Sequence, residues 1–157
     1  MSDIREKLKR VSAAQSADSN TPIDTYRSIL ELKKAVRQHD QQQSRANPFI
    51  ANIEMQVVDA IQYPTATHVY LTSLDANEDD IQHLNDLKWQ HHMDFFTFVL
   101  NLTIWPNQET KLNLDLSLFS KGKCISITGI SRMSFWDKNP ESLSGSLTAI
   151  SKISTMP

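Results

Sequence analysis

Hydrophobic side chains recur at helical spacing near the N-terminus. Ile4, Leu8 and Val11 lie three or four positions apart and predict a short amphipathic helix, whose apolar stripe is too narrow to bury much surface alone. A polar, serine-rich linker follows this stretch. We therefore expect residues 1–20 to form a flexible amphipathic arm, and residues 21–157 to form a single domain.

Two longer helices are predicted next. Thr21–Pro22 should begin a helix that runs to about Gln43, because threonine can cap a helix and proline suits its first position. Asn47–Pro48 repeats this signal, and Pro64 should end the helix that follows. The apolar positions that fit this third helix are Phe49, Ile50, Ile53, Val57 and Ile61.

The pattern then alternates between strand and helix. Residues 67–74 are rich in β-branched and aromatic side chains and predict a short strand. Three acidic residues at 78–80 favour the N-terminus of a helix, which we expect over about 77–93.

A two-residue period dominates the next part of the chain. Residues 94–105 and 110–119 both alternate apolar with other side chains, so they predict a β-hairpin, and residues 124–135 predict a third strand beside it. In that third strand Ile125, Ile127 and Met133 should point inward. Residues 142–153 fit either a helix or an edge strand, and we favour the helix.

These elements predict an α+β fold in which N-terminal helices precede the sheet. The sheet should be an antiparallel β-meander of three to four strands with helices packed on one face.

Composition narrows the classes of protein. Charged residues make up 22% of the chain and the net charge is −2, which argues against both intrinsic disorder and a strongly basic nucleic-acid binder. Residues 1–46 hold nine Lys/Arg against six Asp/Glu, and residues 47–157 hold seven against twelve, so the N-terminal part is mildly basic and the body acidic. A lone cysteine, Cys124, excludes an intrachain disulfide and favours a reducing compartment. With no long apolar run and no apolar core at the N-terminus, we expect a soluble cytoplasmic protein.

Candidate chemistry is sparse. The three glycines match neither GxGxxG nor GxxxxGK[ST], which argues against glycine-rich phosphate loops, and GxSxG is absent. His91 and His92 are adjacent, so they point about 100° apart on a helix and are better explained by its C-terminal end than by a shared metal. Asp79, His83 and Asp86 share a face, but such a row is more often solvated surface. We predict no enzyme activity, no cofactor and no metal.

The second face of the predicted sheet carries the functional hypothesis. Its mixture of aromatic and polar residues is typical of a binding surface, unless the chain's own tail or an N-terminal helix covers it. The leading prediction is a non-enzymatic assembly module that self-associates or docks into a larger complex through this face and the arm. The predicted partner-binding residues are Phe95, Val99, Trp105, Lys111, Asp115, Phe119 and Arg132 on the face, and Ile4, Leu8 and Val11 on the arm.

The alternative prediction is a protein that binds single-stranded nucleic acid across the sheet. Bases would stack on Trp105, Phe119 or Trp136, and phosphates would lie near Lys111, Lys121, Lys123 and Arg132. The acidic body counts against this alternative. No membrane interaction is expected.

Overall fold

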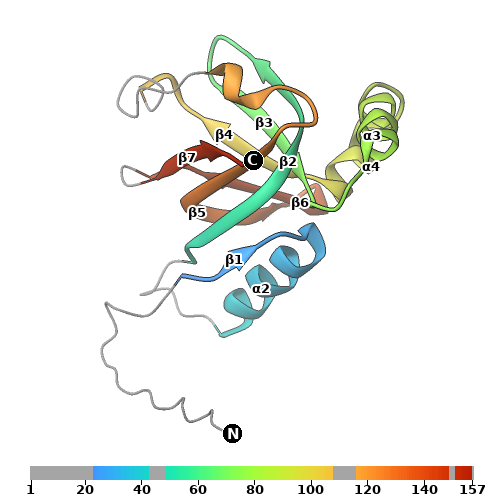
Figure 1. The fold of residues 1–157 in the computed structure, drawn as a ribbon. Helices are drawn as coiled ribbons and strands as arrows, with labels where there is room; N and C mark the ends of the chain where they lie inside the picture. Colours follow the sequence, from blue (N-terminus) through green and yellow to red (C-terminus); the bar gives the residue numbers. More distant parts are fainter. Residues whose placement is uncertain (1–22, 43–48, 108–115, 149–150, 157) are drawn as a thin grey trace, which may run out of the picture.

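The computed structural model describes residues 23–42, 49–107, 116–148 and 151–156 (Figure 1). The two long helices are α2 (Ile29–Gln42) and α3 (Glu78–Gln90), and the short ones are α4 (His92–Phe95), η3 (Phe96–Phe98) and η4 (Leu116–Phe119). The strands are β1 (Thr25–Tyr26), β2 (Ala51–Gln62), β3 (Thr67–Thr72), β4 (Leu100–Ile104), β5 (Cys124–Trp136), β6 (Asn139–Ser146) and β7 (Lys152–Thr155).

Five of the strands close into a barrel. β2 pairs antiparallel with β3, β3 antiparallel with β4, β4 parallel with β6, β6 antiparallel with β5, and β5 antiparallel with β2. β1 extends the sheet beside β2, and β7 lies beside β5. Figure 1 shows the curved strands surrounding one core. Closure leaves few unpaired strand edges among the five strands, which limits uncontrolled pairing with other chains.

The barrel core follows from alternation along each strand. In β2, Ala51, Ile53, Met55 and Val57 are all fully buried, whereas Asn52, Glu54 and Gln56 between them point away from the barrel axis. Leu100, Leu102 and Ile104 of β4 meet them inside the barrel. Each of the valine, leucine, isoleucine and methionine side chains contributes about 1.5–3 kcal/mol by leaving water, so this interior is the main source of stability.

Helix α2 covers one end of the barrel (Figure 1). Its residues Leu32 and Val36 are fully buried in the barrel core. On the flank of the helix, the Arg37 guanidinium lies 4.5 Å from the centre of the Phe135 ring and 3.0 Å from a Glu141 carboxylate oxygen. These contacts fix α2 to β5 and β6.

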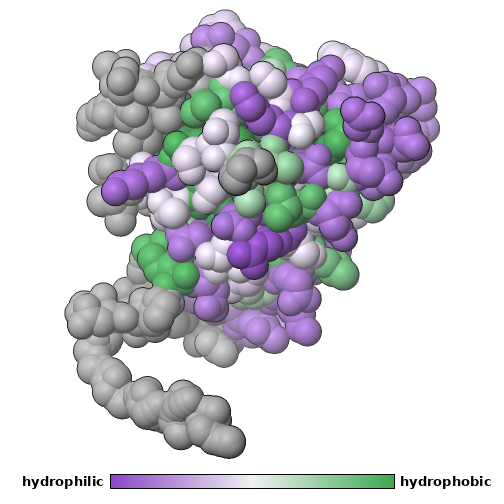
Figure 2. All heavy atoms as spheres, viewed as in Figure 1, coloured by the Kyte–Doolittle hydropathy of each residue, from purple (hydrophilic) through white to green (hydrophobic). Residues whose placement is uncertain are grey.

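Helix α3 packs on the outside of the barrel through a second apolar cluster that includes Val58 and Tyr70. Asn77 caps the helix in a capping box with Asp80, which satisfies free backbone N–H groups. The Lys88 ammonium donates to the Asp59 carboxylate of β2. The remaining surface of α3 is mostly hydrophilic, as Figure 2 shows.

The predicted fold is wrong in its central arrangement. The chain does combine helices with a sheet, but the sheet is a closed mixed barrel and no antiparallel meander with helices on one face. The largest error is the third helix: residues 51–62 form strand β2. Ile53, Val57 and Ile61 fit helical spacing, yet the same segment alternates apolar with polar residues, and pairing with β3 and β5 on both sides selects the strand.

Two later predictions are also wrong. Residues 94–98 continue the helical region as α4 and η3, so the strand begins only at Leu100, and β4 pairs with β3 and β6 in place of a hairpin partner. The favoured C-terminal helix is replaced by strands β6 and β7. The second hairpin strand lies largely outside the described residues, as does the amphipathic arm.

Other predictions are confirmed. The strand at 67–74 corresponds to β3, the helix at 77–93 to α3, and the strand at 124–135 to β5 with Ile125, Ile127 and Met133 buried. His91 is the C-cap of α3 and donates its backbone N–H to Leu87 O at 2.7 Å.

Candidate functional site

The outer surface of β3, β4, β6 and the end of β5 carries a set of polar and aromatic side chains. We call this surface the barrel face. The strand register places His68 opposite Thr103, Asn101 opposite Ser144, and Ser144 opposite Ser134. Since their strand neighbours point into the core, these side chains point outward. The members of the barrel face are Tyr63, His68, Phe96, Asn101, Thr103, Trp105, Arg132, Ser134, Trp136, Asp137, Ser144 and Ser146.

Two neighbouring clefts run along the barrel face. The first has a volume of about 510 Å³ and is lined by residues that include Asn101, Trp136 and Ser144. The second has a volume of about 480 Å³, and its lining includes Trp105 and Ser146. Ser144 and Ser146 lie two positions apart on the same side of β6, so the clefts follow each other along that strand.

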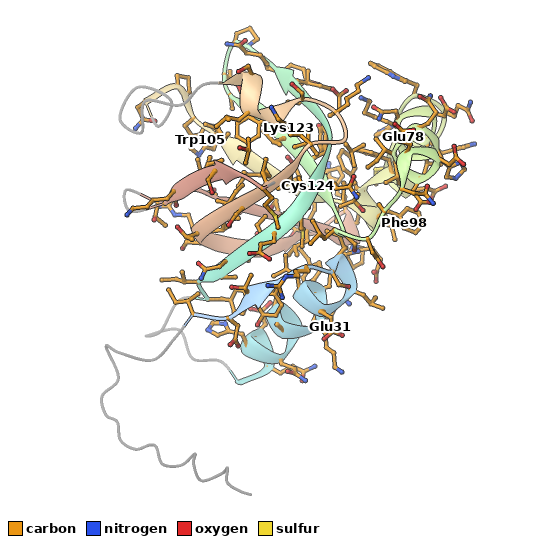
Figure 3. The ribbon with its side chains drawn as sticks, viewed as in Figure 1. Glu31, Glu78, Phe98, Trp105, Lys123 and Cys124 are labelled. Carbon is orange, nitrogen blue, oxygen red and sulfur yellow. The ribbon has the colours of Figure 1, made fainter. Side chains whose placement is uncertain are left out.

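Large rings on the barrel face have much of their surface exposed, and of these Trp136 borders the first cleft and Trp105 the second. The exposed fractions are 47% for Tyr63, 45% for Trp105 and 45% for Trp136. Trp105 lies just beyond the end of β4, at the opposite end of that strand from Phe98 (Figure 3). Exposed aromatic side chains at the edge of a cleft provide flat apolar surface at little entropic cost.

A chain of ring contacts holds part of the face in position. The rings of Tyr63 and His68 have centroids 5.6 Å apart, those of His68 and Tyr70 are 6.5 Å apart, and those of Tyr70 and Phe96 are 6.0 Å apart. Burial, followed by the nearby Tyr63 and Asp59, raises the pKa of Tyr70 to about 12. The Tyr70 phenol is therefore protonated at neutral pH and remains a hydrogen-bond donor.

Some hydrogen-bonding groups on the barrel face have no partner among the residues that the structure describes. His68 Nδ1 and Asn101 Oδ1 are 3.0 Å apart, and since the amide oxygen accepts, the imidazole Nδ1–H is the donor. That bond fixes the Asn101 side chain and leaves its NH₂ group without a partner among the residues that the structure describes. Serine and threonine hydroxyls on β4, β5 and β6 add further donors and acceptors. The arrangement suits hydrogen bonding to a flat ligand that stacks on the rings.

A further cleft lies between α2 and α3, away from the barrel face. It has a volume of about 570 Å³ and includes the exposed side chains of Leu30 and Phe98. Lys33 lies beside it, with its ammonium 2.5 Å from Thr97 O and 3.6 Å from Glu141, and burial lowers the pKa of Lys33. This ammonium already has partners within the fold, and the cleft presents mainly apolar surface, with Ser73, Asp75 and Asp80 among its lining residues.

The predicted site residues fall in three groups. Trp105 and Arg132 are exposed on the barrel face. Phe95, Val99 and Phe119 are buried, with exposed fractions of 0%, 0% and 4%, so their predicted placement on an exposed face is wrong. The residues outside the described part of the chain are Lys111, Asp115, Ile4, Leu8 and Val11.

Sequence reasoning missed other members of the face. Nothing in the sequence marks Tyr63 or His68 as binding residues. The predicted third helix ends near Tyr63, and the predicted strand that contains His68 has no identified partner strand. Ser134 and Ser144 come together only through the β5–β6 pairing, which was not predicted. Lys121 lines a cleft with Gln56 and Glu78, away from the barrel face.

None of the described helices is long and apolar enough to span a membrane. Within the same residues, no cluster of three His, Cys, Asp or Glu side chains is arranged to hold a metal ion.

Comparisons with known proteins found similarity only at the level of solved structures. No protein-family model and no curated protein sequence matches the chain. The OB domain of MM0293 from Methanosarcina mazei is 13% identical, with a TM-score of 0.42 over 70% of this chain and 74% of that one. Schizosaccharomyces pombe Pot1pC bound to ssDNA is 9% identical, with a TM-score of 0.42 over 68% of this chain and 78% of that one.

A third structure, fission yeast Pot1 with ssDNA, is 10% identical, with a TM-score of 0.43 over 91% of this chain and 47% of that one. Likenesses at these levels transfer neither a ligand nor a binding residue to this chain. The chain's own strand pairing, β2-β3-β4-β6-β5 closed on β2, is OB-fold-like, because that fold is a five-stranded Greek-key barrel.

The leading functional prediction is therefore wrong. An assembly module was expected to dock through one face of a meander, yet the meander is absent and three of the seven residues predicted for that face are buried.

Proposed function

We propose that this chain binds single-stranded nucleic acid across the barrel face. The observation that carries the proposal is the set of exposed rings on the barrel face, beside two polar clefts lined by residues of β4, β5 and β6. The barrel face also includes the outer side of β3 and β4, the second and third strands of the barrel. In OB-fold barrels that face, with the adjoining loops, binds oligonucleotides and oligosaccharides. Bases would stack on Tyr63, Trp105 and Trp136, whose exposed fractions of 45–47% leave ring surface available.

The chemistry of the face favours contacts to bases over contacts to phosphates. The Asn101 amide N–H groups have no partner in the described part of the chain, and side-chain amides form paired hydrogen bonds with base edges. The hydroxyls of Thr103, Ser134 and Ser144 add short donors and acceptors around it. Single strands expose these base edges, whereas a duplex hides them in its grooves.

Charge on the face is limited, so binding should depend only weakly on salt. Arg132 lies on the face and Lys138 follows Asp137 in the turn between β5 and β6, and these cations would neutralise about one or two phosphates. For single strands the slope of log K against log salt is about −0.7 per phosphate contact. Raising salt from 50 to 200 mM should therefore weaken binding only about three- to sevenfold.

The direct experiment is fluorescence anisotropy with labelled single-stranded DNA and RNA of mixed sequence, about 12 nucleotides long. We expect saturable binding at 50 mM salt, and a matched duplex should bind more weakly. Replacement of Trp136 by alanine should weaken binding about 5- to 150-fold, since one stacked base contributes about 1–3 kcal/mol.

Trp89 provides the matched control. It is the third tryptophan, it lies on α3 and it is 79% exposed, so Trp89→Ala removes an equal ring from outside the barrel face. The affinity of Trp89→Ala for the single strand should stay within twofold of that of the wild type. Absence of single-strand binding at low salt, or equal losses from Trp89→Ala and Trp136→Ala, would contradict the proposal.

The absence of enzyme activity, the cytoplasmic location and a protein partner or homo-oligomer stay predictions from the sequence.

A further inference from the structure

Arg132 adopts a backbone conformation that arginine rarely adopts. Its φ is 55°, in the left-handed region where the Cβ atom is crowded by the following carbonyl. The residue lies at a bulge: Ser131 pairs with Ser146 and Ser134 pairs with Ser144, so three steps along β5 match two along β6. Arg132 lies within this bulge, between Ser131 and Ser134.

The fold accounts for the bulge but not for the arginine. The bulge shifts the alternation so that Met133, the next residue, is buried in the core. Glycine or asparagine would adopt the same backbone with less strain. The Arg132 side chain is exposed and has no hydrogen bond, ion pair or ring contact with the residues that the structure describes.

Arg132 shares a cleft with Trp105. This cleft of about 480 Å³ also includes Ser131, Ser146 and Thr148. The exposed indole of Trp105 provides a flat apolar ring in this cleft. The exposed guanidinium of Arg132 provides a charged group with parallel N–H donors. A nucleotide has the matching parts, a base that stacks and a phosphate that accepts paired hydrogen bonds.

We propose that this cleft is a subsite for one nucleotide of the bound strand. The base lies on Trp105, and the phosphate is held by the Arg132 guanidinium. The bulge sets the direction in which the Arg132 side chain projects from β5. The strained backbone conformation therefore holds the side chain in position for the phosphate contact. This inference rests on the proposed function, and it assigns the Trp105 end of the barrel face to phosphate recognition, whereas the cleft around Asn101 contacts bases.

Three variants of Arg132 and Trp105 separate charge, geometry and strain. Arg132→Asn removes the charge and relieves strain, because asparagine tolerates the left-handed region. Its Tm should equal or exceed that of the wild type, while its affinity for the labelled single strand falls about tenfold and its salt slope becomes shallower by about 0.7. Arg132→Lys keeps the charge and the strain but loses the paired donors, so we expect an intermediate affinity at an unchanged Tm.

A double-mutant cycle tests whether the two residues hold the same nucleotide. Trp105→Ala with Arg132→Asn should weaken binding less than the product of the two single losses, because either change releases that nucleotide. Lys34→Gln on α2 is the control, since it removes one positive charge from an exposed side chain away from the barrel face, and its affinity should stay within twofold of the wild type.

The outcomes distinguish the subsite from the proposed function. If the wild type binds but Arg132→Asn and Lys34→Gln lose the same small amount, the subsite is refuted and the proposed function stands. Strictly multiplicative losses in the double mutant would also refute a shared nucleotide. If the wild type binds no single strand at 50 mM salt, the proposed function itself fails.

Discussion

Alanine at Trp105 and alanine at Phe119 should have opposite effects, because the structure separates two aromatic residues that the sequence groups together. Phe119 is 4% exposed and belongs to the barrel core, whereas Trp105 is 45% exposed on the barrel face. The first change should therefore lower stability with little effect on binding. The second should lower binding with a smaller effect on stability.

The expected magnitudes differ enough to measure. Truncation of a buried phenylalanine costs about 3–5 kcal/mol, which for a chain of this size lowers Tm by roughly 6–20 °C. Trp105 is about half exposed, so its truncation should cost at most about 2 kcal/mol of stability. Loss of one stacking ring should weaken single-strand binding by about 1–3 kcal/mol, or roughly 5- to 150-fold.

The assay combines thermal unfolding by circular dichroism with anisotropy titration at a temperature where both variants are folded. Phe119→Ala should unfold earlier but bind the oligonucleotide within twofold of the wild type. Trp105→Ala should have a Tm closer to that of the wild type but should bind the oligonucleotide more weakly. If Trp105→Ala has the lower Tm and retains full affinity, Trp105 is a packing residue and the reasoning about the barrel face is refuted.

Three further predictions concern the groups that support the fold. The pKa of Tyr70 is raised from 10.0 to about 12, so the stability contributed by its protonated phenol is present below pH 10 and is lost as the pH rises toward 12. Between pH 10 and pH 12 the urea midpoint should therefore fall more steeply for the wild type than for Tyr70→Phe. Parallel pH curves for the two proteins would contradict this prediction. Lys88→Ala should destabilise the protein by about 3 kcal/mol in urea denaturation, because it leaves the Asp59 carboxylate without its ammonium partner. Adding Asp59→Ala should restore part of this loss. If the two losses simply add in the double mutant, the pairing of Lys88 with Asp59 is refuted. Asn77→Ala should cost about 1 kcal/mol in the same assay through loss of the α3 cap, and an unchanged midpoint would show that the cap is dispensable.

Local sequence signals predicted some elements well. The acidic first turn and the apolar stripe of α3 agree on a helix, and the alternation in β5 leaves no competing helical pattern. These are elements in which cap, period and propensity all indicate the same structure. Their boundaries differ from the prediction by only a few residues.

Strand β2 shows why the barrel was missed. In its sequence ANIEMQVVDAIQ the apolar residues satisfy both a helical and a two-residue spacing, and Asn47–Pro48 before it is a common helix start. Only pairing with β3 on one side and β5 on the other decides between them, and those partners are distant in sequence. Strand pairing of this kind is a tertiary effect that local propensity does not contain.

The candidate site was predicted in part for the same reason. Trp105 and Arg132 could be singled out because an aromatic residue at a strand end and an exposed cation are visible in the sequence. Asn101 and Thr103 lie on the outward side of β4, and Ser134 and Ser144 join them only through the parallel β4–β6 and antiparallel β5–β6 pairings. The buried position of Phe119 likewise depends on η4 packing against the barrel.

Tryptophan emission tests the central claim most directly, because the three tryptophans lie on two different surfaces. A Trp89→Phe variant retains Trp105 and Trp136 on the barrel face, and a Trp105→Phe/Trp136→Phe variant retains only Trp89 on α3. Titration with an unlabelled single strand should quench the first variant in proportion to binding and leave the emission of the second unchanged. Quenching confined to Trp89, or binding without any change at Trp105 and Trp136, would contradict recognition across the barrel face.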